Sequence, residues 1–212
     1  MVEAWRRAGG DIHPDKHLML AARKVDVQKL NHEAQDIRLA SGELSARSID
    51  VNGDKIRLGD RIVFTKNSRD FDVKNGQFGK ITSLDLEAKQ VTVNLEDRKG
   101  KAAIRVVNLN QYEEIKLGYA VTTHKSQGMT TEHSYVLTDE TMQDRELSYV
   151  QMSRAKQSTN IFTTEEEAGE QVSTLARRME RSRQEELALL QKQRAEEAER
   201  IRREKEEQTQ EI

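Results

Sequence analysis

The 212-residue sequence has no cysteine, one proline and one tryptophan, and aromatic residues make up 4% of it. Without cysteine, the chain can form neither a disulfide framework nor a thiolate zinc site. No apolar run approaches the roughly 18 residues of a membrane helix, and the first ten residues lack the apolar core of a signal peptide. These absences predict a cytoplasmic protein with no membrane partner.

Charge is abundant but unevenly distributed, with 34% charged residues against 35% hydrophobic ones. Residues 165–212 hold 10 Lys and Arg against 14 Asp and Glu, whereas residues 1–164 hold 25 against 23. A near-neutral body argues against a polybasic binder but leaves room for a local cationic groove. From Ser173 onward the acidic tail has no Gly or Pro and is rich in helix formers, so we expect 165–212 to form one long, solvated, charged helix.

The segments at the two ends of residues 1–164 have the sequence pattern of an α/β domain. An apolar run at 18–22 precedes a helical pattern that ends before Gly42. Further elements are expected after residue 114, namely strands at 115–121, 134–137 and 160–163 and a helix at 144–156. Strands separated by helices favour a parallel sheet. We therefore expect 1–49 and 115–164 to form one discontinuous domain.

Residues 50–114 have a different pattern of apolar and polar residues. They contain short alternating runs such as QVTVNL, which are separated by turn residues such as Asn75-Gly76. Short strands at this spacing predict a small β-barrel or a tightly curled sheet. We expect this β module to be inserted into the α/β domain, with Phe71 and Phe78 in its core.

The densest polar cluster begins where the apolar run of the 115–121 strand ends. It comprises Thr122, Thr123, His124, Lys125, Ser126, Gln127 and Gly128. Ligands of parallel α/β sheets bind at the carboxyl ends of strands, and a glycine there lets the backbone approach a phosphate closely. The cluster therefore predicts an anion site, although a polar loop that caps the next helix explains the pattern equally well.

A second cluster, ELSYVQMSRAKQ, spans 146–157. Its helical pattern predicts that Tyr149, Val150 and Met152 face the core and that Arg154 lies near the last turn. Cations are favoured at the carboxyl end of any helix. Taken alone, Arg154 therefore has an ordinary structural explanation.

Taken together, the two clusters resemble motifs V and VI of superfamily 1 helicases, in the group that includes the exonuclease-V α subunit. The sequence has TTHKSQG and YVQMSRA in the family's order, about 20 residues apart. The segment LMLAARKVDVQKLN resembles the motif IV region, and LGDRIVFTKNSRDFDVKNGQFGKI resembles an SH3-like insertion. The segment LMLAARKVDVQKLN and the VEAW start are most similar in sequence to TraA-type conjugative relaxase-helicases.

This resemblance implies a RecA-like second motor domain with an inserted SH3-like β-barrel. Arg154 would be the arginine finger that reaches an ATP γ-phosphate. Lys125, Gln127 and Gly128 would serve the nucleotide, with Gln127 and Gly128 coupling it to DNA and Lys125 equally able to serve a DNA phosphate. Single-stranded DNA would be contacted by Thr122, Thr123, His124, Lys66, Asn67, Arg69 and Asn75. ATP and Mg²⁺ would be shared with a first RecA-like domain supplied in cis. For His124, a structural hydrogen bond is an equally good explanation.

A complete motor needs a phosphate loop that ends in Gly-Lys-Ser/Thr. The two Gly-Lys pairs, Gly79-Lys80 and Gly100-Lys101, are followed by Ile and Ala. We therefore expect no ATPase activity from the isolated chain, which would be either a piece of a longer protein or a shortened remnant. A non-enzymatic nucleic-acid-binding or adaptor fragment is the alternative.

No metal site is expected. His13 and His17 lie four residues apart, but Pro14 argues against a regular helix through them, and the neighbouring sequence offers no third ligand.

Overall fold

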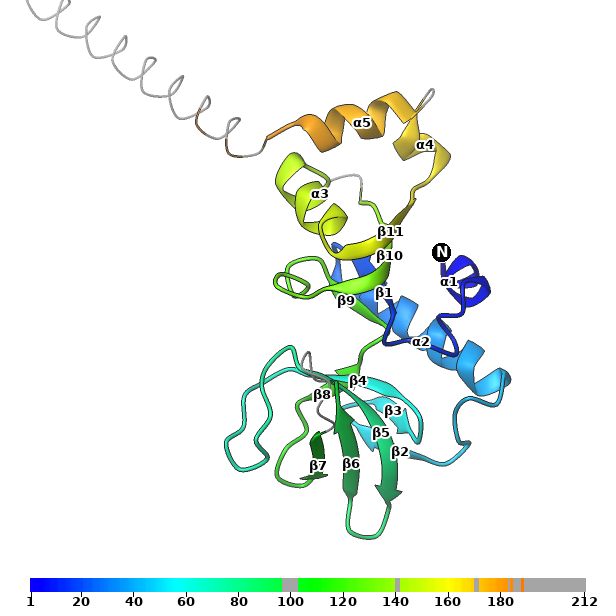
Figure 1. Ribbon diagram of the computed structural model, residues 1–212, viewed down its shortest axis with the longest axis vertical. Coiled ribbons are helices and arrows are strands. Elements are labelled where there is room, and N and C mark those ends of the chain that lie inside the picture. Colours follow the sequence, from blue (N-terminus) through cyan, green and yellow to red (C-terminus); the bar gives the residue numbers. More distant parts are fainter. Residues whose placement is uncertain (97–102, 140–141, 170–171, 183, 185–187, 189–212) are drawn as a thin grey trace, which may run out of the picture.

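Two β-sheets of different kinds lie one after the other along the long axis of the computed structural model (Figure 1). The structure describes residues 1–96, 103–139, 142–169, 172–182, 184 and 188. A four-stranded parallel sheet has the order β11-β10-β1-β9, and a five-stranded antiparallel sheet has the order β7-β6-β5-β4-β8. The predicted α/β class with a parallel sheet is confirmed.

The parallel sheet takes its strands from both ends of the body. They are β1 (His17–Ala21), β9 (Ala120–Thr122), β10 (Thr131–Leu137) and β11 (Ala155–Phe162). Its helices are α1 (Val2–Arg7), α2 (Lys24–Ala40) and α3 (Arg145–Met152). All five residues of β1 are buried, as expected for an inner strand of a parallel sheet that is covered on both faces.

The antiparallel strands lie between β1 and β9 in the chain. They are β4 (Arg61–Phe64), β5 (Phe78–Asp85), β6 (Gln90–Leu95), β7 (Ala103–Asn108) and β8 (Ile115–Leu117). A separate hairpin pairs β2 (Ser48–Val51) with β3 (Asp54–Arg57). Burial alternates along β6, so one face of this sheet packs inward. An SH3-like barrel stays a prediction.

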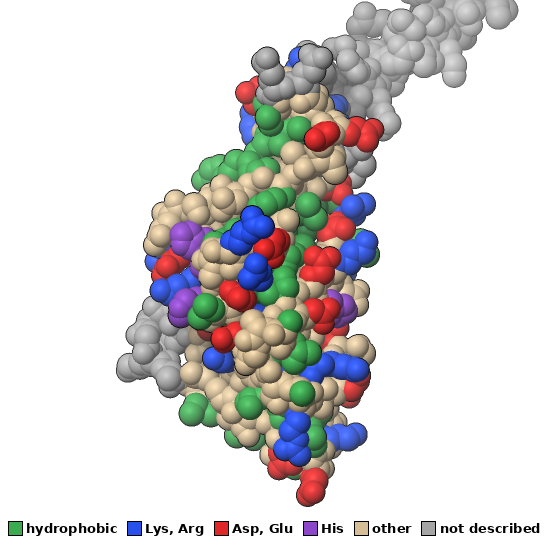
Figure 2. All heavy atoms as spheres, turned by 90° about the vertical axis from the view of Figure 1, so that its right-hand side faces the viewer, with side chains coloured by type: hydrophobic (Ala, Val, Ile, Leu, Met, Phe, Trp, Pro, Cys, Tyr) green, Lys and Arg blue, Asp and Glu red, His purple; other side chains and the backbone are tan. Residues whose placement is uncertain are grey.

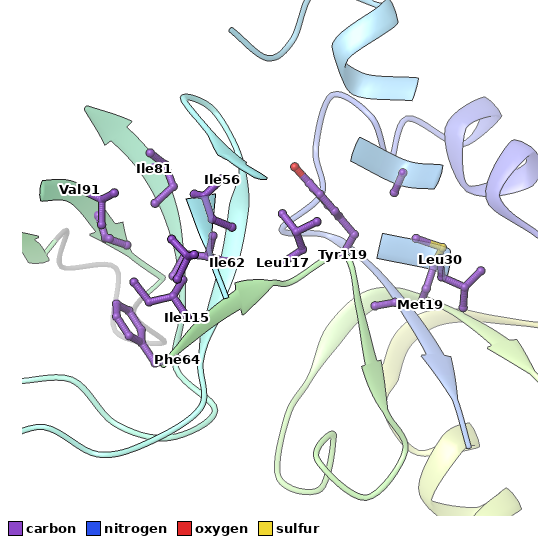
Figure 3. Close-up of a cluster of buried hydrophobic side chains, with 14 of the residues drawn as sticks. Met19, Leu30, Ile56, Ile62, Phe64, Ile81, Val91, Ile115, Leu117 and Tyr119 are labelled. Atoms are coloured by element: carbon purple, nitrogen blue, oxygen red, sulfur yellow. The ribbon is translucent and has the colours of Figure 1, made fainter. Parts of the chain in front are cut away.

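One hydrophobic core joins the two sheets (Figure 3). Met19 of β1 and Leu30 of α2 belong to the same buried cluster as Ile62 of β4. Leu117 and Tyr119 lie between these two groups, where the chain leaves the antiparallel sheet for the parallel one. The sheets therefore pack against each other through shared apolar contacts.

The predicted single strand at 115–121 was wrong. β8 pairs with β4 in the antiparallel sheet, whereas β9 pairs with β1 in the parallel sheet. The chain changes sheet at Gly118, whose N–H donates to the Arg61 carbonyl at 2.8 Å. A Cβ at Gly118 would lie 2.9 Å from the carbonyl carbon of Ile62, so only glycine allows this close backbone approach.

The tail does not begin as the predicted single helix. Residues from Glu165 form two short helices, α4 (Glu165–Ala168) and α5 (Ser173–Glu180). Gly169 lies between them with a φ of +66°, a left-handed conformation that ends a helix. The prediction for residues 189–212 lies outside the described residues. Within the described part, no helix is both long and apolar enough to cross a membrane.

Candidate functional site

The polar loop after β9 separates its side chains into a buried and an exposed set. Thr123 is fully buried, and its N–H donates to the Ala21 carbonyl at 3.0 Å. Ser126 is also fully buried, and its hydroxyl donates to the Thr123 carbonyl at 2.7 Å. The exposed set consists of His124, Lys125, Gln127 and Gly128, and Thr122 is partly exposed. Thr123 thus shapes the loop rather than facing solvent.

Arg154 ties the two predicted motifs together. Its Nη1 donates to the carbonyls of Ser126 and Met129, at 3.1 and 3.3 Å. Its Nε donates to the Val150 carbonyl at 2.8 Å, and its Nη2 donates to the Ser153 hydroxyl at 2.7 Å. Nη1 therefore joins Arg154 to the loop after β9, while Nε and Nη2 fix the guanidinium at the end of α3.

The burial predicted for α3 was wrong. Tyr149 is 74% exposed and Met152 42% exposed, and Val150 is only partly buried. The helix instead buries Leu147, Ser148 and Gln151. Because this inner face carries two polar residues, hydrophobicity alone selected the wrong face of the helix.

Gln151 is a site residue that the sequence analysis missed. Its Nε2 donates to the Thr123 hydroxyl at 3.1 Å, and its Oε1 accepts from Gln143 Nε2 at 3.1 Å. A buried amide with both ends bonded fixes the distance between α3 and the loop. The signal for it was its position four residues after Leu147, on the same helix face.

The predicted DNA residues of the β module lie on the connection between β4 and β5. Lys66, Asn67, Arg69 and Asn75 are all exposed. Asn67 Oδ1 accepts from the Asn75 N–H at 2.8 Å, so this pair braces the connection. Phe71 is partly buried and packs on the core, and Phe78 is buried, as predicted.

This connection reaches the loop after β9. A Cβ at Gly76 would lie 3.6 Å from the Met129 Cε atom, so the Asn75-Gly76 turn lies close to the loop that carries the first motif. Met129 also packs against a cluster that contains Val63 and Phe78 of the antiparallel sheet and Val121 of the parallel sheet. The two sets of predicted DNA residues therefore adjoin each other.

Lys125 in the exposed part of the loop is influenced by two lysines from other elements. Burial lowers the pKa of Lys125, and the nearby charges of Lys116 on β8 and Lys24 on α2 lower it further. Like charges that influence one another in this way create a local positive potential. By contrast, cationic and anionic side chains are interspersed on the face shown in Figure 2.

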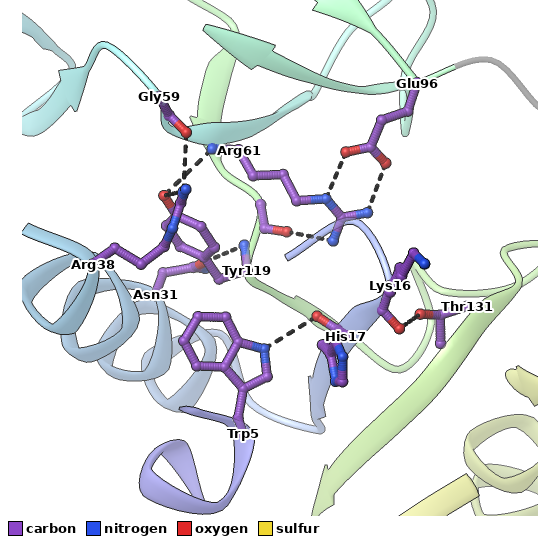
Figure 4. Close-up of polar contacts among 11 residues, drawn as sticks. Trp5, Lys16, His17, Asn31, Arg38, Gly59, Arg61, Glu96, Tyr119 and Thr131 are labelled. Carbon is purple, nitrogen blue, oxygen red and sulfur yellow. Dashed lines mark hydrogen bonds and ion pairs between the residues drawn. The ribbon is translucent and has the colours of Figure 1, made fainter. Parts of the chain in front are cut away.

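A buried polar network fixes the crossing between the two sheets (Figure 4). Arg38 of α2 donates to the Tyr119 hydroxyl at 2.8 Å, and that hydroxyl donates to Asp60 Oδ1 at 2.5 Å. Asn31 Oδ1 accepts from the N–H groups of Tyr119 and Ala120, both at 2.9 Å. Burial raises the pKa of Asp60 to about 6, against the opposing effect of its hydrogen bonds. Burial also raises the pKa of Tyr119.

Arg61 forms a second link at this crossing. It makes a bidentate ion pair with Glu96, with both N···O distances at 2.8 Å, and donates to the Gly118 carbonyl at 3.0 Å. Its guanidinium carbon lies 4.2 Å from the centre of the Phe78 ring. The two sheets are thus joined by directional contacts as well as by apolar packing.

His17 has a structural role. Its Nδ1 lies 3.0 Å from the Tyr135 hydroxyl, and its ring stacks on His133 with centroids 4.7 Å apart. Burial lowers the pKa of His17, and the charge of His133 lowers it further. In the part of the chain that the structure describes, no three His, Cys, Asp or Glu side chains gather as metal ligands.

Both the sequence and the fold of this chain are similar to those of known proteins. No protein-family model matches the chain. Over 148 residues it is 31% identical to the conjugal transfer protein TraA of Agrobacterium fabrum, an alignment that covers 68% of this chain and 13% of that protein. Over 160 residues it is 29% identical to the ATP-dependent DNA helicase Pif1 of Campylobacter jejuni, with coverage of 64% and 34%.

A solved structure shares the fold. The crystal structure of Bacteroides Pif1 bound to single-stranded DNA matches with a TM-score of 0.55 at 20% identity, covering 86% of this chain and 46% of that one. This chain is homologous to TraA conjugal transfer proteins and to Pif1 helicase. Its parallel sheet resembles the RecA-like domain of Pif1.

The TraA homology covers a small part of the relatives. A probable TraA of Sinorhizobium fredii is 30% identical over 167 residues, which is 76% of this chain but 14% of that protein. The chain spans about an eighth of the length of these TraA proteins. Activities of a whole TraA protein therefore reach this chain only as proposals.

Proposed function

We propose that this chain is the second motor domain of an ATP-dependent, single-stranded DNA translocase in a TraA-like conjugative transfer protein. The observation that carries the proposal is the clamp made by Arg154, which joins the end of α3 to the loop after β9. In this account, nucleotide and DNA sites meet on one rigid unit. ATP and Mg²⁺ are shared with a first RecA-like domain that provides the phosphate loop in cis.

The roles within the unit are those that the resemblance to superfamily 1 helicases implies. Arg154 is the arginine finger, since a guanidinium can stabilise the charge that develops during phosphoryl transfer. To reach a γ-phosphate, it exchanges part of its contact with the Ser126 and Met129 carbonyls. ATP hydrolysis is thereby coupled to the shape of the loop, and Lys125, Gln127 and Gly128 lie on the loop's exposed side.

The single strand follows the surface from that loop to the Asn75-Gly76 turn. Thr122, His124 and Lys125 contact its backbone beside the loop, and Thr123 holds the loop in shape. Lys66, Asn67, Arg69 and Asn75 contact it on the β module, which we take to be SH3-like. The proximity of Gly76 to Met129 supports a path for the strand from one surface to the other.

Fluorescence anisotropy with a labelled dT12 oligonucleotide tests the DNA surface. Each lost phosphate contact should reduce the slope of log K against log salt by about 0.7. We expect this loss from Lys66→Ala and from Lys125→Ala. The exposed Lys29 on α2 provides the matched control, because Lys29→Ala removes the same charge from a residue that belongs to neither loop.

The same titration separates the alternative function. A non-enzymatic adaptor would bind through the β module alone, so Lys66→Ala would weaken binding while Lys125→Ala, Gln127→Ala and Arg154→Ala left it unchanged. That pattern would contradict the motor proposal. Weaker DNA binding by both Lys66→Ala and Lys125→Ala would support the motor proposal.

A further inference from the structure

A cavity of about 240 Å³ lies between the loop after β9 and α3. The loop contributes His124 and Gln127, and α3 contributes Leu147 and Val150. Gln184, which follows α5, forms another part of the wall. The cavity is smaller than the roughly 300 Å³ at the lower end of pockets for drug-sized ligands, so it suits one ring system rather than a nucleoside triphosphate.

The lining has the chemistry of a site for a flat ring with a polar edge. Met142, Leu147 and Val150 provide apolar walls, and the exposed imidazole of His124 can stack on a heteroaromatic ring. The amides of Gln127 and Gln184 each offer donors and an acceptor to the edge of such a ring. A nucleobase combines these two requirements.

Charge decides which part of a nucleotide enters. The carboxylates of Asp144 and Glu146 also line the cavity, and a carboxylate only accepts hydrogen bonds, so it cannot donate one to a phosphate oxygen. The positive charge lies at Lys125, next to His124 in the chain, and is shared with Lys116 and Lys24, which act on Lys125 electrostatically. A strand that crosses the loop can therefore place its phosphates near the lysines and one base in the cavity.

Arg181 and Ser182, shortly before Gln184, are anchored to the first turn of α3. Leu175 of α5 is 3% exposed, and the Arg145 N–H at the start of α3 donates to the Arg181 carbonyl at 2.9 Å. The Ser182 hydroxyl donates to Glu146 Oε1 at 2.6 Å. These contacts bring Gln184 to the cavity, so the wall it forms is held by α3 itself.

We propose that this cavity receives one unstacked nucleobase of the bound single strand, with Gln184 as part of its outer wall. The proposal rests on the proposed function, because the strand must first bind along the loop. It adds a base contact to a surface that otherwise reads only the phosphate backbone. Stacking of this kind tolerates different bases.

The test compares two 12-mers of equal charge, dT12 and a fully abasic sugar-phosphate strand, by anisotropy with the full 212-residue chain. We expect the wild type to bind dT12 about fivefold or more tightly than the abasic strand. Val150→Phe fills the cavity and should reduce this ratio at least threefold, with unchanged affinity for the abasic strand. Ile12→Phe, on an exposed turn, is the control and should keep the wild-type ratio.

Gln184→Ala provides a second variant that does not depend on repacking, since Gln184 is exposed. It should also reduce the ratio while leaving the melting temperature of the protein unchanged. Equal ratios in the wild type, Val150→Phe and Gln184→Ala would overturn the base site while leaving the DNA surface intact. Binding of neither strand at low salt would overturn the proposed function itself, and the base site with it.

Discussion

At the scale of single residues, the buried carboxyl group of Asp60 makes stability depend on pH. It accepts hydrogen bonds from the Tyr119 hydroxyl, from Gln35 Nε2 and from the Arg57 N–H. Its pKa is nevertheless raised from 3.8 to about 6, because burial outweighs these bonds. The folded state therefore binds the proton more tightly than the unfolded state does.

The sign of the effect follows from linkage. The stabilising contribution of protonated Asp60 is complete below pH 4 and is lost as the pH rises through about 6. Asp60→Asn cannot titrate. The unfolding free energy of the wild type minus that of the variant should therefore fall as the pH rises from 4 to 7. Urea denaturation across this range measures it, with Glu43→Gln as the exposed control. A difference that grows with pH would contradict the assignment.

Gly10 is required by the packing of Trp5 rather than by its own backbone angles. A Cβ at Gly10 would lie 2.4 Å from the indole ring of Trp5, which is fully buried and donates to the His17 carbonyl. Gly10→Ala should therefore cost about 1 to 3 kcal/mol through overpacking. Because Trp5 is the only tryptophan, a red shift of its emission would report the displacement. An unchanged emission maximum and midpoint would refute this prediction.

At the scale of elements, the sequence predicted kinds of structure better than their partners. The strand-helix opening, the alternating runs of the β module and the helix after Asp144 were all recognisable, because local periodicity and capping determine them. Asp144 is the N-cap of α3, and its side chain accepts from the Leu147 N–H at 2.7 Å. These features depend on neighbouring residues alone.

What the sequence could not predict depends on contacts between distant residues. The break between β8 and β9 arises because Gly118 passes against Ile62, 56 positions earlier in the chain. The inner face of α3 was missed because Gln151 is satisfied by Thr123 across the site. The motif residues were recognisable as a family pattern, but the clamp from Arg154 to the loop carbonyls was not.

Helix α5 docks through one main apolar anchor. Leu175 is 3% exposed, whereas Val172 is 53% exposed. Leu175→Ala should weaken this docking by about 2 to 5 kcal/mol and increase amide hydrogen exchange in Ser173–Glu180. Val25→Ala on α2 removes an exposed apolar side chain as the control. Unchanged exchange in α5 would show that Leu175 does not hold the helix.

At the scale of the whole molecule, the shared core should make the two sheets unfold together. Apolar contacts and the network around Tyr119 join them, so neither sheet keeps its packing when the other is lost. We expect coincident urea transitions for Trp5 fluorescence, which reports on α1, and for far-ultraviolet circular dichroism. Two separated transitions would show that the sheets are independent units.

The central claim is that Arg154 belongs to a motor completed by another domain. Its most direct test is DNA-stimulated ATP hydrolysis by the chain joined in cis to a first RecA-like domain that carries a phosphate loop. We expect the isolated chain to be inactive and the joined protein to be active. We expect Arg154→Ala to lower kcat about 10³-fold or more, Arg154→Lys to fail to restore it, and the exposed control Arg177→Ala to leave it unchanged. Full activity in Arg154→Ala would contradict the account.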